Sequence, residues 1–396
     1  MKILEVTGQK PIEQIAPMPR FERSGRIIEL DGLRGFATVL IVATHFVANG
    51  PHTVPFPILT VAFSLLGIGS VGLDLFFVLS GFLIGGILLR ERNSPRYFST
   101  FYLRRFHRIF PIYYAWLILF LIVRLVAVHV YAEPLSAFHT GCPMPLYFVY
   151  LQNWFFSERG FALSWLGPTW SLGVEEQFYL TIPLLVHFLP LRRLTQLLVA
   201  LVLFAPLFRV AVYFAYGWPS FIGPAFAWTP SRADQLALGV LAAIVSSSPA
   251  GREWIQRHLQ LIYGMLTILT VLICIQIPAI LNIASVEGNV VAPCTIEFFA
   301  LCLILVLVYH PQGKLAAFCR LSWFRQLGIY SYCIYLIHYG IDHACFYFIL
   351  HGRTRFNDWP SIFVSFLAFG ITVGVASLSW RYFEKPLLKR GEIYRY

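Results

Sequence analysis

Runs of about twenty apolar residues recur along almost the whole chain, and they constrain its fold more than any other feature. A helix of that length crosses the hydrocarbon core of a bilayer, where backbone polar groups must be satisfied internally. The apolar set makes up 58% of the 396 residues and the charged set only 12%. Since a soluble protein would lack the polar surface it needs, the sequence predicts an all-α, polytopic transmembrane bundle. Nucleic-acid binders, disordered chains and disulfide scaffolds are excluded.

Proline, glycine and charged residues divide these runs into about ten predicted spans. The approximate cores are 33–50, 68–89, 109–130, 170–190, 194–216, 233–247, 259–279, 292–309, 327–349 and 361–381. The further apolar segment 143–156 is expected in or near the membrane interface. We predict one membrane domain over residues 29–388, between an N-terminal tail (1–28) and a C-terminal tail (389–396).

The distribution of basic residues predicts the orientation of the spans. With both termini in the cytosol, 24 of the 30 Lys and Arg residues lie on the cytosolic side, as the positive-inside rule requires. We therefore expect cytosolic tails and a bacterial inner (plasma) membrane location. The seven cysteines form no CxxC motif or Cys/His cluster, so no metal site is predicted.

A basic cluster precedes the third predicted span. It contains Arg104, Arg105, His107 and Arg108, with Pro111 expected in the first turn of the span helix. Arg105 and Arg108 would share a helix face. The cluster fits a stop-transfer or lipid-headgroup anchor. The cluster also fits a clamp for a cytosolic polyanion, because guanidinium groups match phosphate oxygens, although an arginine cluster by itself favours the anchor.

The first predicted span carries Asp31 and Arg34 at its start and His45 eleven residues beyond Arg34. Eleven residues are about three helical turns, so Arg34 and His45 share a face about 16 Å apart. An intramembrane His either packs and hydrogen-bonds or serves function, and a neutral imidazole can remove a hydroxyl proton. Asp31 would brace Arg34, orient a base, or favour the helix N-terminus.

Other polar groups in the predicted spans allow two interpretations. Asp74 and Asp234 are expected to pair with buried arginines rather than to do chemistry. Ser331, Tyr335 and His338 form one helical stripe, which suits core hydrogen bonding or catalysis. Glu175 and Glu176 are expected at the outer start of the fourth span, opposite the arginine clamp, where Glu175 would contact acceptor hydroxyls or simply complete an acidic first turn.

Seven motifs, taken together, resemble the acyltransferase 3 family of integral-membrane O-acyltransferases over nearly the whole chain. The first is Arg34, ten residues and His45. The others follow in family order: Val71–Ile84 with Asp74 and Ser80, Arg105-Phe-His-Arg108, Pro168–Leu180 with Trp170 and Glu175, Ser231–Gly239, Gly328–His338 with Ser331 and Tyr335, and Ser377–Pro386.

The resemblance implies transfer of an acyl group, commonly acetyl from acetyl-CoA, to a hydroxyl of a carbohydrate or a macrolide-like natural product. It implies that His45 is catalytic, that Arg34, Arg105 and Arg108 bind the donor, and that Glu175 is the acidic site residue. No bound cofactor or metal is expected, and the partners are acyl-CoA, the acceptor and the bilayer. Larger members carry an extra soluble domain after the last span, which we do not expect here.

A second function class fits the intramembrane ionisable groups alone. His and carboxylates could form the proton relay of a transporter or of a flippase for a sugar or lipid-linked sugar. An arginine-rich cytosolic clamp has no evident use in such a carrier.

Overall fold

The computed structural model describes residues 27–48, 67–130, 140, 142–155, 165–217, 222–282, 285–351 and 358–396. Almost all of the predicted N-terminal tail (1–28) therefore lies outside the described residues. In the described part every regular element is helical and there is no strand. The all-α prediction is confirmed.

Ten helices coincide with the ten predicted span cores. They are α2 (Ile28–Ala48), α4 (Ser70–Glu91), α5 (Tyr97–Val130), α7 (Trp170–Phe188), α8 (Leu191–Tyr216), α10 (Ala233–Ser247), α12 (Leu259–Leu281), α13 (Ala292–Tyr309), α15 (Ser322–Leu350) and α16 (Trp359–Ser379). The shorter α-helices are α6 (Met144–Phe148), α9 (Ile222–Ala227), α11 (Pro249–Arg257), α14 (Lys314–Cys319) and α17 (Lys385–Gly391). Single 3-10 turns cover Gly67–Gly69, Gln152–Trp154, Gly167–Thr169 and Thr229–Arg232, and π-helical turns cover Glu287–Val291 and Trp380–Glu384.

By length and composition, 7 of the described helices are apolar enough to cross a membrane, or 8 if the bent pair of α10 and α11 is one span. α2 and α7 are not among them. The number of spans and the orientation of the termini stay predictions.

α5 begins at Tyr97, well before its predicted core, and Pro111 lies inside it. The expectation that Pro111 opens the helix is wrong. A proline in a helix interior loses one backbone hydrogen bond, which a membrane bundle tolerates because neighbouring groups can compensate. As a result Arg105 and Arg108 belong to the same continuous helix as the apolar part of α5, and they do share a face.

Two helix crossings depend on glycine. A Cβ atom at Gly328 of α15 would lie 1.8 Å from the Asp31 carbonyl oxygen of α2, and one at Gly239 of α10 would lie 2.1 Å from the Val78 carbonyl oxygen of α4. Only glycine allows backbones to approach so closely, as in other membrane bundles. The crossing of α2 and α15 brings together the two helices that carry the histidines of the candidate site.

Residues 143–155, between α5 and α7, pack one side against the bundle. The Tyr113 hydroxyl donates to the Tyr147 carbonyl oxygen at 2.8 Å, and the side chains of Gln152 and Asn153 have no exposed surface. The Gln177 side chain of α7 donates to Asn153 Oδ1 at 2.8 Å. The other side of the segment is apolar and exposed, with Phe148, Val149, Leu151 and Phe155 on it. The placement of 143–156 in or near the membrane interface therefore stays a prediction. Gln177 and Asn153 hold the segment against the start of α7.

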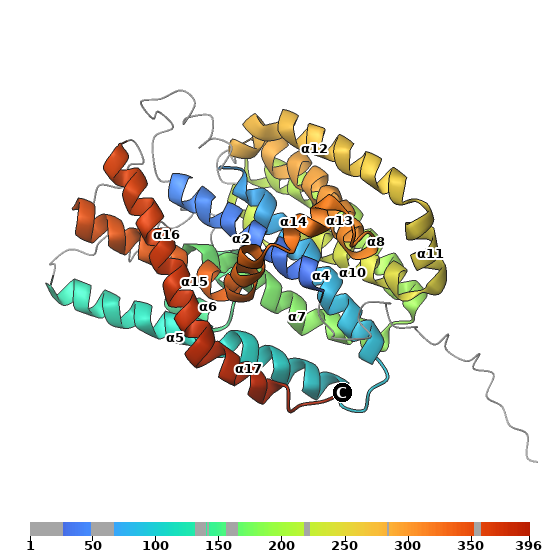
Figure 1. Cartoon of the computed structure of the whole chain (residues 1–396), viewed down its shortest axis with the longest axis horizontal. Coiled ribbons are helices and arrows are strands. Elements are labelled where there is room, and N and C mark those ends of the chain that lie inside the picture. Colours follow the sequence, from blue (N-terminus) through green and yellow to red (C-terminus); the bar gives the residue numbers. More distant parts are fainter. Residues whose placement is uncertain are drawn as a thin grey trace, which may run out of the picture.

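The remaining helices enclose this centre. Figure 1 shows α12 along one edge of the molecule and α5, α16 and α17 along the opposite edge. α17 packs against the first half of α5. There the Arg104 Nε donates to the Tyr394 carbonyl oxygen at 2.8 Å. The C-terminal residues thus lie directly against the basic cluster of α5.

Candidate active site

Two histidines from α2 and α15 meet in the middle of the bundle. Nδ1 of His45 lies 2.7 Å from Nε2 of His338, and the two rings stack with centroids 5.0 Å apart. His338 has no exposed surface, and His45 is half-buried. The sequence placed these residues in separate motifs, and the fold turns them into one hydrogen-bonded pair.

The hydrogen bonds assign the tautomer of each neutral ring. His338 Nδ1 lies 3.1 Å from the Ile334 carbonyl oxygen, which can only accept, so this nitrogen carries the proton. His338 Nε2 is then an acceptor, and His45 Nδ1 must donate to it. The lone pair of His45 therefore resides on Nε2. A histidine held in this form can accept a proton from a hydroxyl group.

Tyr335 joins this pair to the start of α7. Its ring lies 5.9 Å from the His338 ring, and its hydroxyl lies 2.6 Å from Ser171 Oγ. The Tyr335 hydroxyl also lies 2.7 Å from the Pro168 carbonyl oxygen, to which it can donate. Ser331, the third member of the predicted stripe, is 2% exposed on the same helix face. The stripe lines the interior of the site.

A second cluster lies around the arginines predicted to bind the donor. Arg34 of α2 and Arg105 and Arg108 of α5 are within electrostatic reach of one another. In the described part of the chain, none of the three forms an ion pair within 4 Å. Three converging guanidinium groups without carboxylate partners attract an anion with several oxygens, such as a phosphate.

Glu175 belongs to this arginine cluster. Its carboxylate lies within electrostatic reach of Arg34, Arg105 and Arg108 and close to the Tyr179 side chain. The expectation that Glu175 lies opposite the clamp is wrong. α7 does not start at the outer end of the bundle: its first turn contacts Tyr335 in the interior, so residues five positions along reach the arginines.

Two other predicted residues have defined places near the arginines. Ser80 Oγ of α4 lies 2.8 Å from the hydroxyl of Tyr179, which follows Glu175 by one turn of α7. Asp31 lies in the first turn of α2 and within electrostatic reach of Arg34. Both the bracing interpretation of Asp31 and the helix-terminus interpretation agree with this position.

Asp74 and Trp170 lie in a separate, structural network. Asp74 Oδ1 pairs with Arg232 Nη1 at 2.9 Å, and the Arg232 guanidinium lies 5.7 Å from the centre of the Trp170 ring. Asp234 Oδ2 pairs with Arg209 Nη1 at 2.8 Å, with both side chains fully buried. The prediction that Asp74 and Asp234 pair with buried arginines is confirmed.

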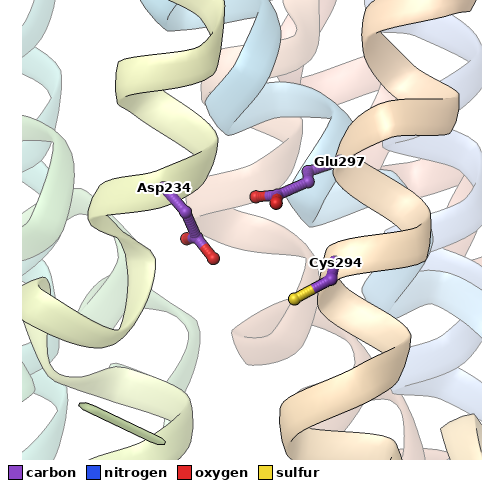
Figure 2. Close-up of side chains that lie close together, drawn as sticks. All are labelled: Asp234, Cys294 and Glu297. Atoms are coloured by element: carbon purple, nitrogen blue, oxygen red, sulfur yellow. The ribbon is translucent and has the colours of Figure 1, made fainter. Parts of the chain in front are cut away.

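Figure 2 shows Asp234 of α10 facing Cys294 and Glu297 of α13. Their potential ligand atoms lie within 4.8 Å of one another. However, the Arg209 guanidinium already lies among them: besides its pair with Asp234, its Nη2 donates to Cys294 Sγ at 3.2 Å. A metal ion would have to displace this cation, so the cluster is better explained as the acidic partner of Arg209.

The comparisons with known proteins agree with the motifs. A family described as "Acyltransferase domain" matches residues 27–381, most of the chain. The chain belongs to the acyltransferase 3 family. No solved structure matches it. Its helical spans and its membership of this family make it a multi-pass integral membrane protein.

Several members of the acyltransferase 3 family are similar to nearly the whole chain. O-acetyltransferase OatA of Staphylococcus aureus is 26% identical over 91% of this chain and 57% of its own length. Peptidoglycan O-acetyltransferase OatA of Listeria monocytogenes is 28% identical over 95% of this chain and 58% of its own length. Putative peptidoglycan O-acetyltransferase YrhL of Bacillus subtilis is 27% identical over 91% of this chain and 55% of its own length. The chain thus spans less than two thirds of the length of these relatives.

The sequence interpretation missed two contributors within the family motifs. Tyr179 lies four residues after Glu175, a spacing that places both on one helix face and could have indicated their contact. Ser171 follows Trp170 in the same motif, and its bond to Tyr335 depends on the buried start of α7. Nothing in the local sequence indicates that second contact.

Proposed function

We propose that this acyltransferase 3 chain is a membrane O-acetyltransferase that moves an acetyl group from acetyl-CoA to a carbohydrate hydroxyl. The observation that carries the proposal is the arrangement along α2. The arginine cluster surrounds Arg34 at one end, and the His45–His338 pair lies about 16 Å farther along the same helix. An anion-binding end and a proton-accepting end on one helix face suit an extended, phosphate-bearing donor.

On the donor side, Arg34, Arg105 and Arg108 would hold the phosphates of coenzyme A. Their lack of ion pairs with described residues supports this role, because a paired guanidinium would first have to leave its carboxylate. The pantetheine arm would then run along α2 and bring the thioester to His45.

On the chemical side, His45 would act as general base. His45 Nε2 takes the proton of the acceptor hydroxyl while the hydroxyl oxygen attacks the thioester carbonyl carbon. The C–O bond forms, the C–S bond breaks, and the thiolate of coenzyme A recovers the proton from His45. The products are the O-acetyl ester and the free thiol. His338 Nε2 accepts the other His45 N–H throughout, so it orients the ring and stabilises the imidazolium.

Glu175 would be a positioning residue for the arginines. Its charge acts on all three guanidinium groups. Together with Asp31, which acts on Arg34 and Arg108, it reduces the mutual repulsion of the guanidinium groups, whose N–H donors stay available to a phosphate. This role replaces the acceptor contact expected from the sequence.

The names of the relatives make peptidoglycan the first acceptor to test. The Listeria monocytogenes protein is named for O-acetylation of peptidoglycan, and a glycan strand offers many hydroxyl groups. The bacterial inner membrane would be the corresponding location.

The test uses purified protein in lipid nanodiscs, radiolabelled acetyl-CoA and soluble peptidoglycan glycan strands. We expect thiol release that depends on the glycan, together with label in the glycan. Absence of release and transfer, combined with glycan flux across proteoliposomes, would overturn the enzyme proposal in favour of a transporter or flippase.

A further inference from the structure

A buried carboxylate with one unsatisfied oxygen lies one helical turn beyond the histidine pair. Asp342 is 3% exposed, and its Oδ1 has no hydrogen-bond partner in the described structure. It follows His338 by four residues on α15, which places it about 6 Å farther along the helix axis. Native proteins rarely leave a buried carboxylate oxygen unsatisfied, because the lost hydration is not replaced. A bound ligand that donates a hydrogen bond would satisfy this oxygen.

Asp342 also projects towards the side of α15 on which His45 lies. The His45 ring stacks on His338 and meets the Tyr339 ring edge-on at 5.6 Å, so it lies between these two positions around the helix. At about 100° per residue, Asp342 projects about 40° from His338 in the direction of Tyr339. Asp342 therefore lies on the same face of α15 as the one that His45 contacts, one helical turn farther along α15.

The direction of the two helices places Asp342 away from the donor end. α2 and α15 run parallel, since Asp31 lies against Gly328 and His45 lies against His338. The direction from Arg34 to His45 along α2 is thus the same as the direction from Gly328 to Asp342 along α15. A donor stretched from the arginines to His45 leaves the far end, where Asp342 lies, for the second substrate.

Building on the proposed function, we propose that Asp342 binds hydroxyl groups of the acceptor carbohydrate and thereby sets acceptor specificity. A carboxylate can accept hydrogen bonds from two hydroxyl groups of the acceptor glycan, and its charge strengthens both. Filling this site satisfies the unpartnered oxygen and holds a third hydroxyl close to His45. An acceptor with no hydroxyl group besides the reacting one would leave the carboxylate unsatisfied and bind poorly.

The experiment measures the KM for soluble peptidoglycan glycan strands at saturating acetyl-CoA, and the Kd for coenzyme A by calorimetry, in nanodisc-embedded protein. Asp342→Ala removes the carboxylate, and Asp342→Asn keeps the side-chain volume and one acceptor oxygen. Cys345→Ala serves as the control, because Cys345 is buried nearby on α15 at 8% exposure.

We expect Asp342→Ala to raise the acceptor KM at least about tenfold, since hydrogen bonds to a charged group contribute that much. Asp342→Asn should give a smaller rise, and Cys345→Ala none. The Kd for coenzyme A should stay unchanged in all three variants.

An unchanged acceptor KM in both Asp342 variants would overturn this inference. So would a parallel loss of coenzyme A affinity, because that outcome indicates general distortion of the site. If the unsubstituted protein transfers no acetyl group to any acceptor, the proposed function itself fails and Asp342 loses its assigned role with it.

Discussion

Nδ1 of His45 lies 2.7 Å from Nε2 of His338, which in turn is anchored through Nδ1 to the backbone of its own helix. This relay places one fixed proton between the rings and leaves His45 Nε2 as the acceptor nitrogen. In other acyl-transfer enzymes a carboxylate accepts the N–H of the catalytic histidine and orients its ring. Here the neutral imidazole of His338 takes the place of that carboxylate.

Substitution of His338 should therefore lower turnover without weakening substrate binding. We expect His338→Ala to reduce kcat about 100-fold or more while both KM values stay within about twofold, because ring orientation matters most in the transition state. His338→Gln offers a carbonyl oxygen to His45 and should restore part of the loss. Steady-state kinetics with both substrates provides the measurement. Equal kcat values for the Ala and Gln variants would argue against an orienting hydrogen bond.

The arginine cluster predicts a difference between neighbouring residues of one motif. Arg105→Ala and Arg108→Ala should each weaken coenzyme A binding about tenfold or more, because each removes a charge-assisted contact to phosphate. Arg104→Ala is the matched control: it removes the same charge, but Arg104 is bonded to the Tyr394 carbonyl oxygen. Calorimetry with coenzyme A separates the variants. Similar losses in all three would mean that the basic cluster acts through its net charge alone.

The sequence predicted most of the local structure but little of the site geometry. All ten predicted cores are helices, and Asp74 and Asp234 do pair with arginines, because apolar periodicity and the cost of buried charge are local properties. The His45–His338 contact joins residues 293 positions apart, and no local pattern encodes it.

The error on Glu175 has a similar origin. A span model starts each helix at a membrane surface, whereas the first residues of α7 are buried inside the bundle, beside the packed side of residues 143–155. Gln177 fixes that segment through the Asn153 side chain and the Tyr150 carbonyl oxygen. Only the folded arrangement of these distant polar groups determines the depth at which Glu175 lies.

The close crossing of α2 and α15 should be sensitive to a single methyl group. Gly328→Ala would place a Cβ atom 1.8 Å from the Asp31 carbonyl oxygen, so the helices must separate at a cost of about 1–3 kcal/mol or more. We expect a lower Tm and, below it, a reduced kcat, because His45 and His338 move apart. Gly370→Ala on α16 is the control, since no atom lies within 4 Å of its added Cβ. A Gly328→Ala protein with unchanged Tm and kcat would show that the crossing is looser than described.

The buried ion pair of Asp74 and Arg232 should serve stability rather than chemistry. Arg232→Met leaves the Asp74 carboxylate buried without its partner, at an expected cost of about 3–5 kcal/mol. Replacing both residues, with Asp74→Leu added, should recover much of that loss, and the folded double variant should keep its KM values. Thermal unfolding in detergent, followed by kinetics on the folded fraction, provides the check. A folded double variant without activity would instead assign this pair to the reaction.

The most direct test of the central claim, that His45 is the general base of acetyl transfer from acetyl-CoA, is single-turnover acetyl transfer by His45→Ala. The measurement compares this variant with the unsubstituted protein and determines the Kd for coenzyme A of both. The proposed mechanism predicts a rate at least about 100-fold lower, the usual contribution of a general base, with an unchanged Kd. Transfer at the unsubstituted rate, or loss of coenzyme A binding in step with the rate, would contradict it.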